Sequence, residues 1–141
     1  MSVTFPLAII EPDPIVREGL IHVLGVRPLR VVRAWSSVDA ACSEQSAIHE
    51  LYVVLVSAIG SVPLEPEEAA RLRERYPTAR IALLVSEYST LTERQAIGSN
   101  IAGALLRSSP PTNLRKSLEL IALGEGVFPL PSVHSEVDPS S

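Results

Sequence analysis

The chain has 141 residues and a formal net charge of −4, with 46% hydrophobic and 20% charged residues. These figures fit one domain with a hydrophobic core and exclude disorder throughout the chain, while the acidic balance argues against direct binding of nucleic acid. No apolar run approaches the ~18–20 residues of a transmembrane helix, and the N-terminus lacks the basic start of a signal peptide, so we expect a cytoplasmic protein. A single cysteine, Cys42, excludes an intramolecular disulfide and a multi-cysteine zinc site.

Short apolar runs rich in Val, Ile and Leu recur along the chain at the usual length of β-strands. They are apolar throughout rather than alternating, which is typical of parallel strands that are covered on both faces. The predicted strands are Pro6–Ile10, Leu29–Ala34, Leu51–Val56, Ile81–Val85 and Ala102–Leu106.

Segments with helical periodicity lie between and after these strands. The first has Asp13 as its expected N-cap and Pro14 at the first helical position, and the last ends before Gly124. The predicted helices are Pro14–Leu24, Ser36–Ile48, Pro66–Tyr76, Thr90–Ile97 and Pro110–Leu123. This alternation predicts an α/β fold, a doubly wound, five-stranded parallel sheet in the order 2-1-3-4-5.

The predicted domain covers residues 1–131, and residues 132–141 are expected to form a polar tail or linker. In folds of this kind, functional sites lie at the carboxyl ends of the strands. The residues expected at that edge are Glu11, Pro12, Asp13, Ser57, Val85, Ser86 and Arg107.

Three segments resemble one protein family, in the same order and at the same spacing. They are Ile9–Leu20, which contains Glu11-Pro12-Asp13 and Arg17-Glu18-Gly19-Leu20, then Asn100–Arg107, and Leu123–Pro131. They are similar to the receiver domain of NarL/LuxR-type response regulators, a (βα)5 domain of the flavodoxin/CheY-like kind. The resemblance covers about residues 6–131.

The resemblance implies phosphoryl transfer from a histidine kinase to an aspartate at the end of the third strand. In the family, two acids after the first strand help to bind Mg²⁺, and a Thr or Ser and a Lys bind the phosphoryl group. Here the acceptor position falls on Ser57, the second acid on Pro12 and the lysine on Arg107. The Thr or Ser position falls on Val85, or on Ser86 if the register is shifted by one. The joint loss of these groups predicts a degenerate receiver that is not switched by phosphorylation.

Glu11 and Asp13 permit two interpretations. They could form a residual metal or ligand site, but two such side chains without a third would hold a hard cation weakly. We favour Asp13 as a helix cap, Glu11 in an ion pair with Arg107, and Ser57 as a packed serine at the strand end. We expect no metal and no cofactor.

Enzyme motifs such as a glycine-rich dinucleotide loop, a P-loop or a serine elbow do not occur in the sequence, so we expect no enzyme. The favoured function is a pseudo-receiver in a two-component-type transcription regulator, with a helix-turn-helix domain outside this chain. The alternatives are a stand-alone adaptor domain and a small-ligand sensor that uses the vacated acidic pocket with Arg107.

The last predicted helix has two apolar faces. Leu114, Leu118 and Ile121 form the stripe expected to face the core. Leu120 and Leu123 lie outside that stripe, with Lys116 between them. We expect this second face to form a homodimer interface, to which the fifth strand and the fourth helix contribute.

Overall fold

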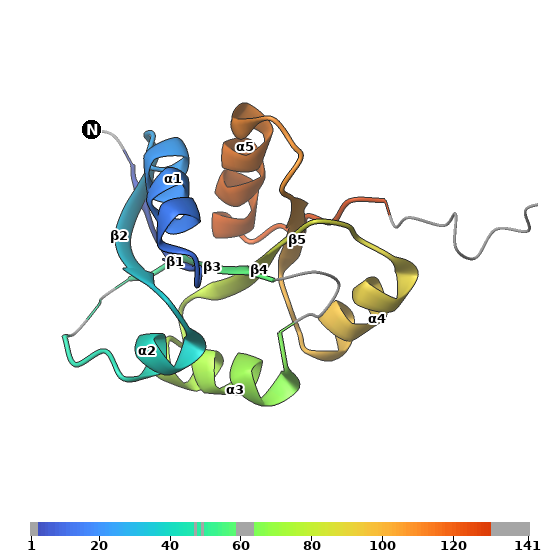
Figure 1. The fold of residues 1–141 in the computed structure, drawn as a ribbon, viewed down its shortest axis with the longest axis horizontal. Coiled ribbons are helices and arrows are strands. Elements are labelled where there is room, and N and C mark those ends of the chain that lie inside the picture. The colour runs from blue at the N-terminus through green and yellow to red at the C-terminus, as the bar shows by residue number, and fades with distance from the viewer. Residues whose placement is uncertain (1–2, 47, 49, 59–63, 131–141) are drawn as a thin grey trace, which may run out of the picture.

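The computed structural model describes residues 3–46, 48, 50–58 and 64–130 of the chain, so the predicted tail, 132–141, lies outside the described residues. Five strands pair in parallel in the order β2-β1-β3-β4-β5, which confirms the predicted fold class (Figure 1). The strands are β1 (Phe5–Ile10), β2 (Leu29–Trp35), β3 (Val53–Ser57), β4 (Arg80–Val85) and β5 (Gly103–Leu106).

Helices cover both faces of the sheet, with α1 and α5 on one face and α2, α3 and α4 on the other (Figure 1). The helices are α1 (Pro14–Leu24), α2 (Val38–Cys42), α3 (Pro66–Arg75), α4 (Thr90–Gly98) and α5 (Pro111–Ala122). Within the part of the chain that the structure describes, we find no helix with both the length and the hydrophobicity to cross a bilayer.

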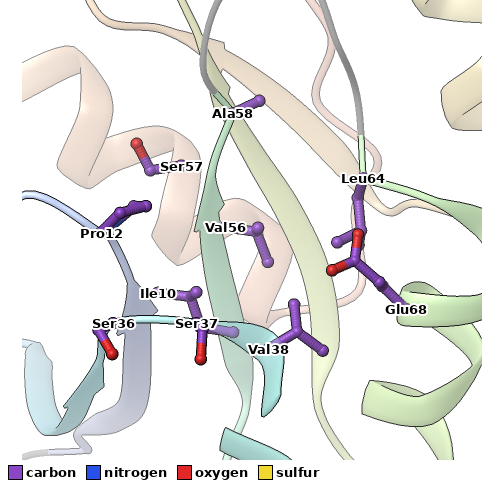
Figure 2. A pocket seen from close by; sticks show the side chains of 10 residues that line it. All are labelled: Ile10, Pro12, Ser36, Ser37, Val38, Val56, Ser57, Ala58, Leu64 and Glu68. Atoms are coloured by element: carbon purple, nitrogen blue, oxygen red, sulfur yellow. The ribbon is translucent and has the colours of Figure 1, made fainter. Parts of the chain in front are cut away.

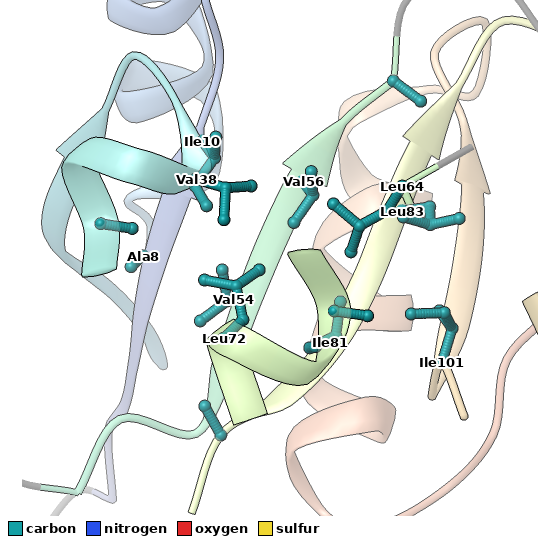
Figure 3. Close-up of a cluster of buried hydrophobic side chains, with 14 of the residues drawn as sticks. Ala8, Ile10, Val38, Val54, Val56, Leu64, Leu72, Ile81, Leu83 and Ile101 are labelled. Carbon is teal, nitrogen blue, oxygen red and sulfur yellow. The ribbon is translucent and has the colours of Figure 1, made fainter. Parts of the chain in front are cut away.

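Two apolar cores lie on the two faces of the sheet, because successive side chains of a strand point to opposite faces. Ala8 and Ile10 of β1 belong to the core under α2 and α3, part of which is shown in Figure 3. Leu7 and Ile9 belong to the core under α1 and α5. The side chain two positions beyond Ile9, which is Glu11, therefore continues the α1 and α5 face at the carboxyl edge.

Helix α1 has the predicted bounds. The Oδ1 atom of Asp13 accepts hydrogen bonds from the backbone N–H groups of Ile15, at 2.9 Å, and Val16, at 3.3 Å. Pro14 occupies the first helical position, where its missing N–H has no intrahelical partner to lose. The expected role of Asp13 as the N-cap is confirmed.

Helix α2 is shorter than the predicted Ser36–Ile48, and this prediction was wrong. The carboxylate of Glu44, just after the helix, accepts hydrogen bonds at 3.2 Å from the Trp35 indole and from Arg33. The Glu44 backbone carbonyl accepts a 2.6 Å hydrogen bond from the Arg75 guanidinium of α3. These tertiary contacts replace the helical bonds that local periodicity suggested.

Helix α5 ends in a Schellman motif at Gly124, the predicted cap. The N–H of Gly124 donates to Ile121 at 3.0 Å, the N–H of Glu125 donates to Leu120 at 2.9 Å, and Gly124 has a φ of 105°. The chain then turns back onto the outer edge of β5. Val127 forms a parallel bridge with Gly103 there, with its carbonyl accepting from Ala104 at 2.8 Å.

Candidate functional site

Three strand ends bring Glu11, Ser57 and Arg107 together at the carboxyl edge of the sheet. The Ser57 hydroxyl donates to Oε1 of Glu11 at 2.5 Å. Arg107 donates to the same Oε1 atom at 3.2 Å and also to the Ser57 hydroxyl. The predicted ion pair between Glu11 and Arg107 is therefore confirmed, and so is the packing of Ser57 at the strand end, where it is 8% exposed.

Glu11 is a buried carboxylate, with only 3% of its surface exposed. Burial alone raises the pKa of this carboxyl group. The hydrogen bonds from Ser57, from the Asp13 backbone N–H at 2.9 Å and from Arg107, together with the charge of Arg107, outweigh burial and lower the pKa below its ordinary value. Glu11 is therefore ionised at neutral pH, and its charge is balanced inside the protein.

Arg17 adds a contact that sequence reasoning missed. From the first turns of α1 its guanidinium donates to the backbone carbonyl of Glu11 at 2.8 Å. The Arg-Glu-Gly-Leu motif drew attention to this residue only as part of a family pattern. A signal was present, because a long basic side chain one helical turn after the N-cap can fold back over the preceding strand end.

The other residues expected at this edge take no part in the network. Pro12 is exposed and lines a neighbouring pocket. Val85 is 2% exposed and belongs to the core that contains Ile10 and Val56, whereas Ser86 is exposed. Ser86 lies two positions beyond Leu84 of the α1 and α5 core, so strand alternation would continue that face of the sheet at Ser86 rather than at Val85.

The described residues at this edge do not fit the Mg²⁺ that the fold family implies. Both carboxylate oxygens of Glu11 already accept hydrogen bonds, and Pro12 offers no side-chain oxygen. One oxygen of Asp13 caps α1. Among the described residues, no three His, Cys, Asp or Glu side chains form a group that could hold a metal ion.

A pocket of about 280 Å³ lies beside the network, on the α2 and α3 side of the sheet (Figure 2). Its lining is largely apolar and includes three serines and one glutamate. The lining residues are Ile10, Pro12, Ser36, Ser37, Val38, Val56, Ser57, Ala58, Leu64 and Glu68. Neither Glu11 nor Arg107 is among them, so the acidic group and its cation face each other rather than this pocket.

The two faces of α5 are separated as predicted. Leu114, Leu118 and Ile121 are buried in the core. Leu120 is 38% exposed and Leu123 is 66% exposed, and Lys116 is also exposed. An apolar surface therefore remains on α5 after the domain has folded.

The fold is that of CheY-like receiver domains. No protein-family model and no curated protein sequence matches the chain. Its structure is similar to a LuxR family DNA-binding response regulator from Silicibacter pomeroyi, with a TM-score of 0.72 and 22% identity over 92% of this chain and 99% of the other.

Two further solved structures show the same fold. The signal receiver domain of a NarL response regulator from Mycobacterium tuberculosis has a TM-score of 0.73 and 23% identity, over 87% of this chain and 99% of that one. The non-phosphorylated receiver domain of the stress response regulator RcsB from Escherichia coli has a TM-score of 0.74 and 18% identity, over 90% and 99% of the two chains. These similarities establish the architecture of the domain.

Proposed function

We propose that the chain is a phosphorylation-independent receiver domain of a cytoplasmic, NarL/LuxR-like transcription regulator, and that it acts by protein contacts rather than as an enzyme. The observation that carries this proposal is Ser57 at the end of β3. Its hydroxyl is bonded to Glu11 and Arg107 at the position where the family places its phosphoacceptor aspartate.

The chemistry of this group opposes phosphoryl transfer. A serine needs a base to become a nucleophile. The carboxylate that accepts the hydrogen bond of the Ser57 hydroxyl is Glu11, and its lowered pKa makes it a weak base. Among the described residues, Mg²⁺ also finds no ligand set with which to neutralise charge on a transferring phosphoryl group. We therefore interpret the network as a structural ion pair that joins three strand ends at the carboxyl edge of the sheet.

The proposal places DNA binding in a part of the regulator outside this chain. In solved structures of similar fold, RcsB dimers are bound to DNA, and this chain spans 64% of the RcsB chain in that complex. The domain described here has a net charge of −4, which does not suit a surface that neutralises phosphates. We therefore assign it no direct nucleic acid contact.

A homodimer through α5 is the contact that the exposed leucines support best. Leu120 and Leu123, with Lys116 between them, offer a surface that a second copy would cover. The edge of β5 at Gly103 is already paired with Val127, so we centre the interface on α5 and give β5 a smaller part than the sequence suggested. Without a phosphorylation step, the dimer should form constitutively or with a partner.

Sedimentation velocity at tens of micromolar tests this function. We expect the dimer fraction of the wild-type chain to be the same with and without acetyl phosphate and Mg²⁺. A dimer fraction that rises with the phosphodonor would contradict phosphorylation independence.

The two alternatives have weaker support. A stand-alone adaptor would use the same α5 contacts, and linkage to a DNA-binding domain in the full regulator separates it from the proposal. A ligand sensor would use the pocket in Figure 2, but neither Glu11 nor Arg107 lines that pocket. The contact-based function therefore accounts for more of the structure.

A further inference from the structure

A second pocket, also of about 280 Å³, lies at the opposite end of the sheet, where β4 and β5 begin. Helix α3 contributes Arg73, the start of β4 contributes Arg80, and the turn before β5 contributes Asn100. Gly126 and Phe128 complete the lining from the segment that closes the edge of β5. Elements that are distant in sequence therefore form this pocket.

The charge in this pocket has one sign. Two arginines line it, and none of the described residues that line it is acidic, although the chain as a whole carries a net charge of −4. Concave sites lined by one sign of charge concentrate small ions of the opposite sign. The local charge therefore points to an anionic ligand.

Neither arginine of the pocket has a carboxylate partner in the described part of the chain. By contrast, Arg33, Arg71 and Arg107 pair with carboxylates at 3.2, 2.6 and 3.2 Å. Arg73 donates a single 2.7 Å hydrogen bond to the backbone carbonyl of Ser99, which fixes its guanidinium at the pocket without neutralising it.

Within the described part of the chain, the Arg80 side chain has an unpaired hydrogen-bond donor. Its Nε atom is buried and has no hydrogen-bond partner among the described residues. The charge of this guanidinium is therefore only partly compensated by the protein, and an oxyanion would add charge-assisted hydrogen bonds at its other N–H groups. The strand position also restrains this residue, because the backbone N–H of Arg80 donates to Tyr52 at 2.9 Å.

We propose that this pocket binds a small oxyanion, a phosphate or a carboxylate, between the guanidinium groups of Arg73 and Arg80. Guanidinium groups bind both kinds of oxyanion through paired hydrogen bonds. Because Gly126 and Phe128 line the same pocket, the bound anion links the C-terminal segment to α3 and β4. The site is distinct from the carboxyl edge, and its existence does not depend on the function proposed above.

Backbone amide NMR titrations of the whole chain test the site, with inorganic phosphate in one series and succinate in another, at constant ionic strength against chloride. We expect saturable shifts of the amides of Asn100, Ala102 and Gly126, with a dissociation constant of roughly 1–10 mM. Tighter binding of phosphate would assign the site to phosphates, and tighter binding of succinate to carboxylates; both results support an oxyanion site.

Three variants make the test specific. Arg80→Met and Arg73→Met, each checked for a dispersed spectrum, should each weaken binding by about tenfold. The control, Arg94→Met, removes one exposed charge of α4 outside the pocket and should change binding by less than about twofold. Shifts that do not saturate with either anion, or an equal loss in the control and both pocket variants, would overturn the proposal.

Discussion

The carboxyl edge of the sheet and the outer face of α5 differ in how far their side chains are covered by the rest of the protein. Glu11 is 3% exposed, and Ser57, Arg107 and the Asp13 backbone N–H bond its two carboxylate oxygens. Leu123, the C-cap residue directly after α5, is 66% exposed. The polar groups at the carboxyl edge are thus bonded to one another, whereas the apolar surface of α5 stays exposed. This contrast is the basis of our proposal that protein contacts, rather than a covalent switch, carry the function.

The largest effect is expected when charges are placed on the exposed face of α5. Leu120→Glu/Leu123→Glu should weaken the homodimer by about a hundredfold, because four carboxylates would meet across a two-fold interface. Sedimentation equilibrium measures this constant. The matched control is Ile15→Glu, which charges a residue of α1 that is 83% exposed.

The control should leave the dimer intact while the double variant becomes monomeric. A wild-type chain that is monomeric at tens of micromolar, or a double variant that dimerises as well as wild type, would show that the α5 face does not form a homodimer interface. Loss of the dimer in Ile15→Glu alone would place the interface on α1.

Breaking the ion pair at the carboxyl edge should have the next largest effect. Arg107→Met leaves the Glu11 carboxylate buried without its cation, so the free energy of unfolding should fall by about 2 kcal/mol. Urea denaturation measures the change. Arg94→Met removes an exposed arginine and should change stability by less than about 0.5 kcal/mol. Equal effects of the two variants would show that the network contributes little.

The pH dependence of stability sharpens the same point. The pKa of Glu11 is lower in the folded chain than in the unfolded one, so the unfolded state takes up the proton first as the pH falls. The stabilisation by Glu11 is therefore complete above about pH 4.5 and is lost as the pH falls through the lowered pKa.

Glu11→Gln should accordingly be about 1 kcal/mol less stable than wild type at pH 7, and the difference should shrink as the pH falls below about 4.5 and through the lowered pKa of Glu11. Urea denaturation of both proteins across this range gives the difference directly. A difference that is constant with pH would mean that the carboxylate charge is not what stabilises this edge.

The smallest effect is expected from restoring the acceptor residue alone. Ser57→Asp should remain unlabelled by acetyl phosphate with Mg²⁺, because Pro12 supplies no metal ligand and Arg107 is a planar cation in place of a compact ammonium. Intact-mass measurement detects labelling. The triple variant Pro12→Asp/Ser57→Asp/Arg107→Lys tests whether all three losses matter together. Efficient labelling of the single variant would show that the other two losses are minor.

Much of the architecture was predictable because it is encoded locally. Asp13 and Pro14 define the start of α1, and its predicted bounds agree with the structure. The meeting of Glu11, Ser57 and Arg107 follows from the rule that parallel strands end at one edge of the sheet.

Features that depend on tertiary contacts were not predictable. Glu44 leaves the α2 region to bind Trp35 and Arg75, which no local pattern reveals. The pairing of Val127 with the edge of β5 requires a glycine at position 103, since a Cβ there would lie 2.8 Å from the Val127 carbonyl oxygen. Such contacts depend on where distant segments lie after folding.

The most direct test of the central claim is intact-mass spectrometry of the wild-type chain after incubation with acetyl phosphate and Mg²⁺, beside a receiver domain that retains its aspartate. We predict an unchanged mass for this chain and one added phosphoryl group on the control. A stoichiometric phosphoryl increment that maps to Ser57, Glu11 or Asp13 would contradict the account.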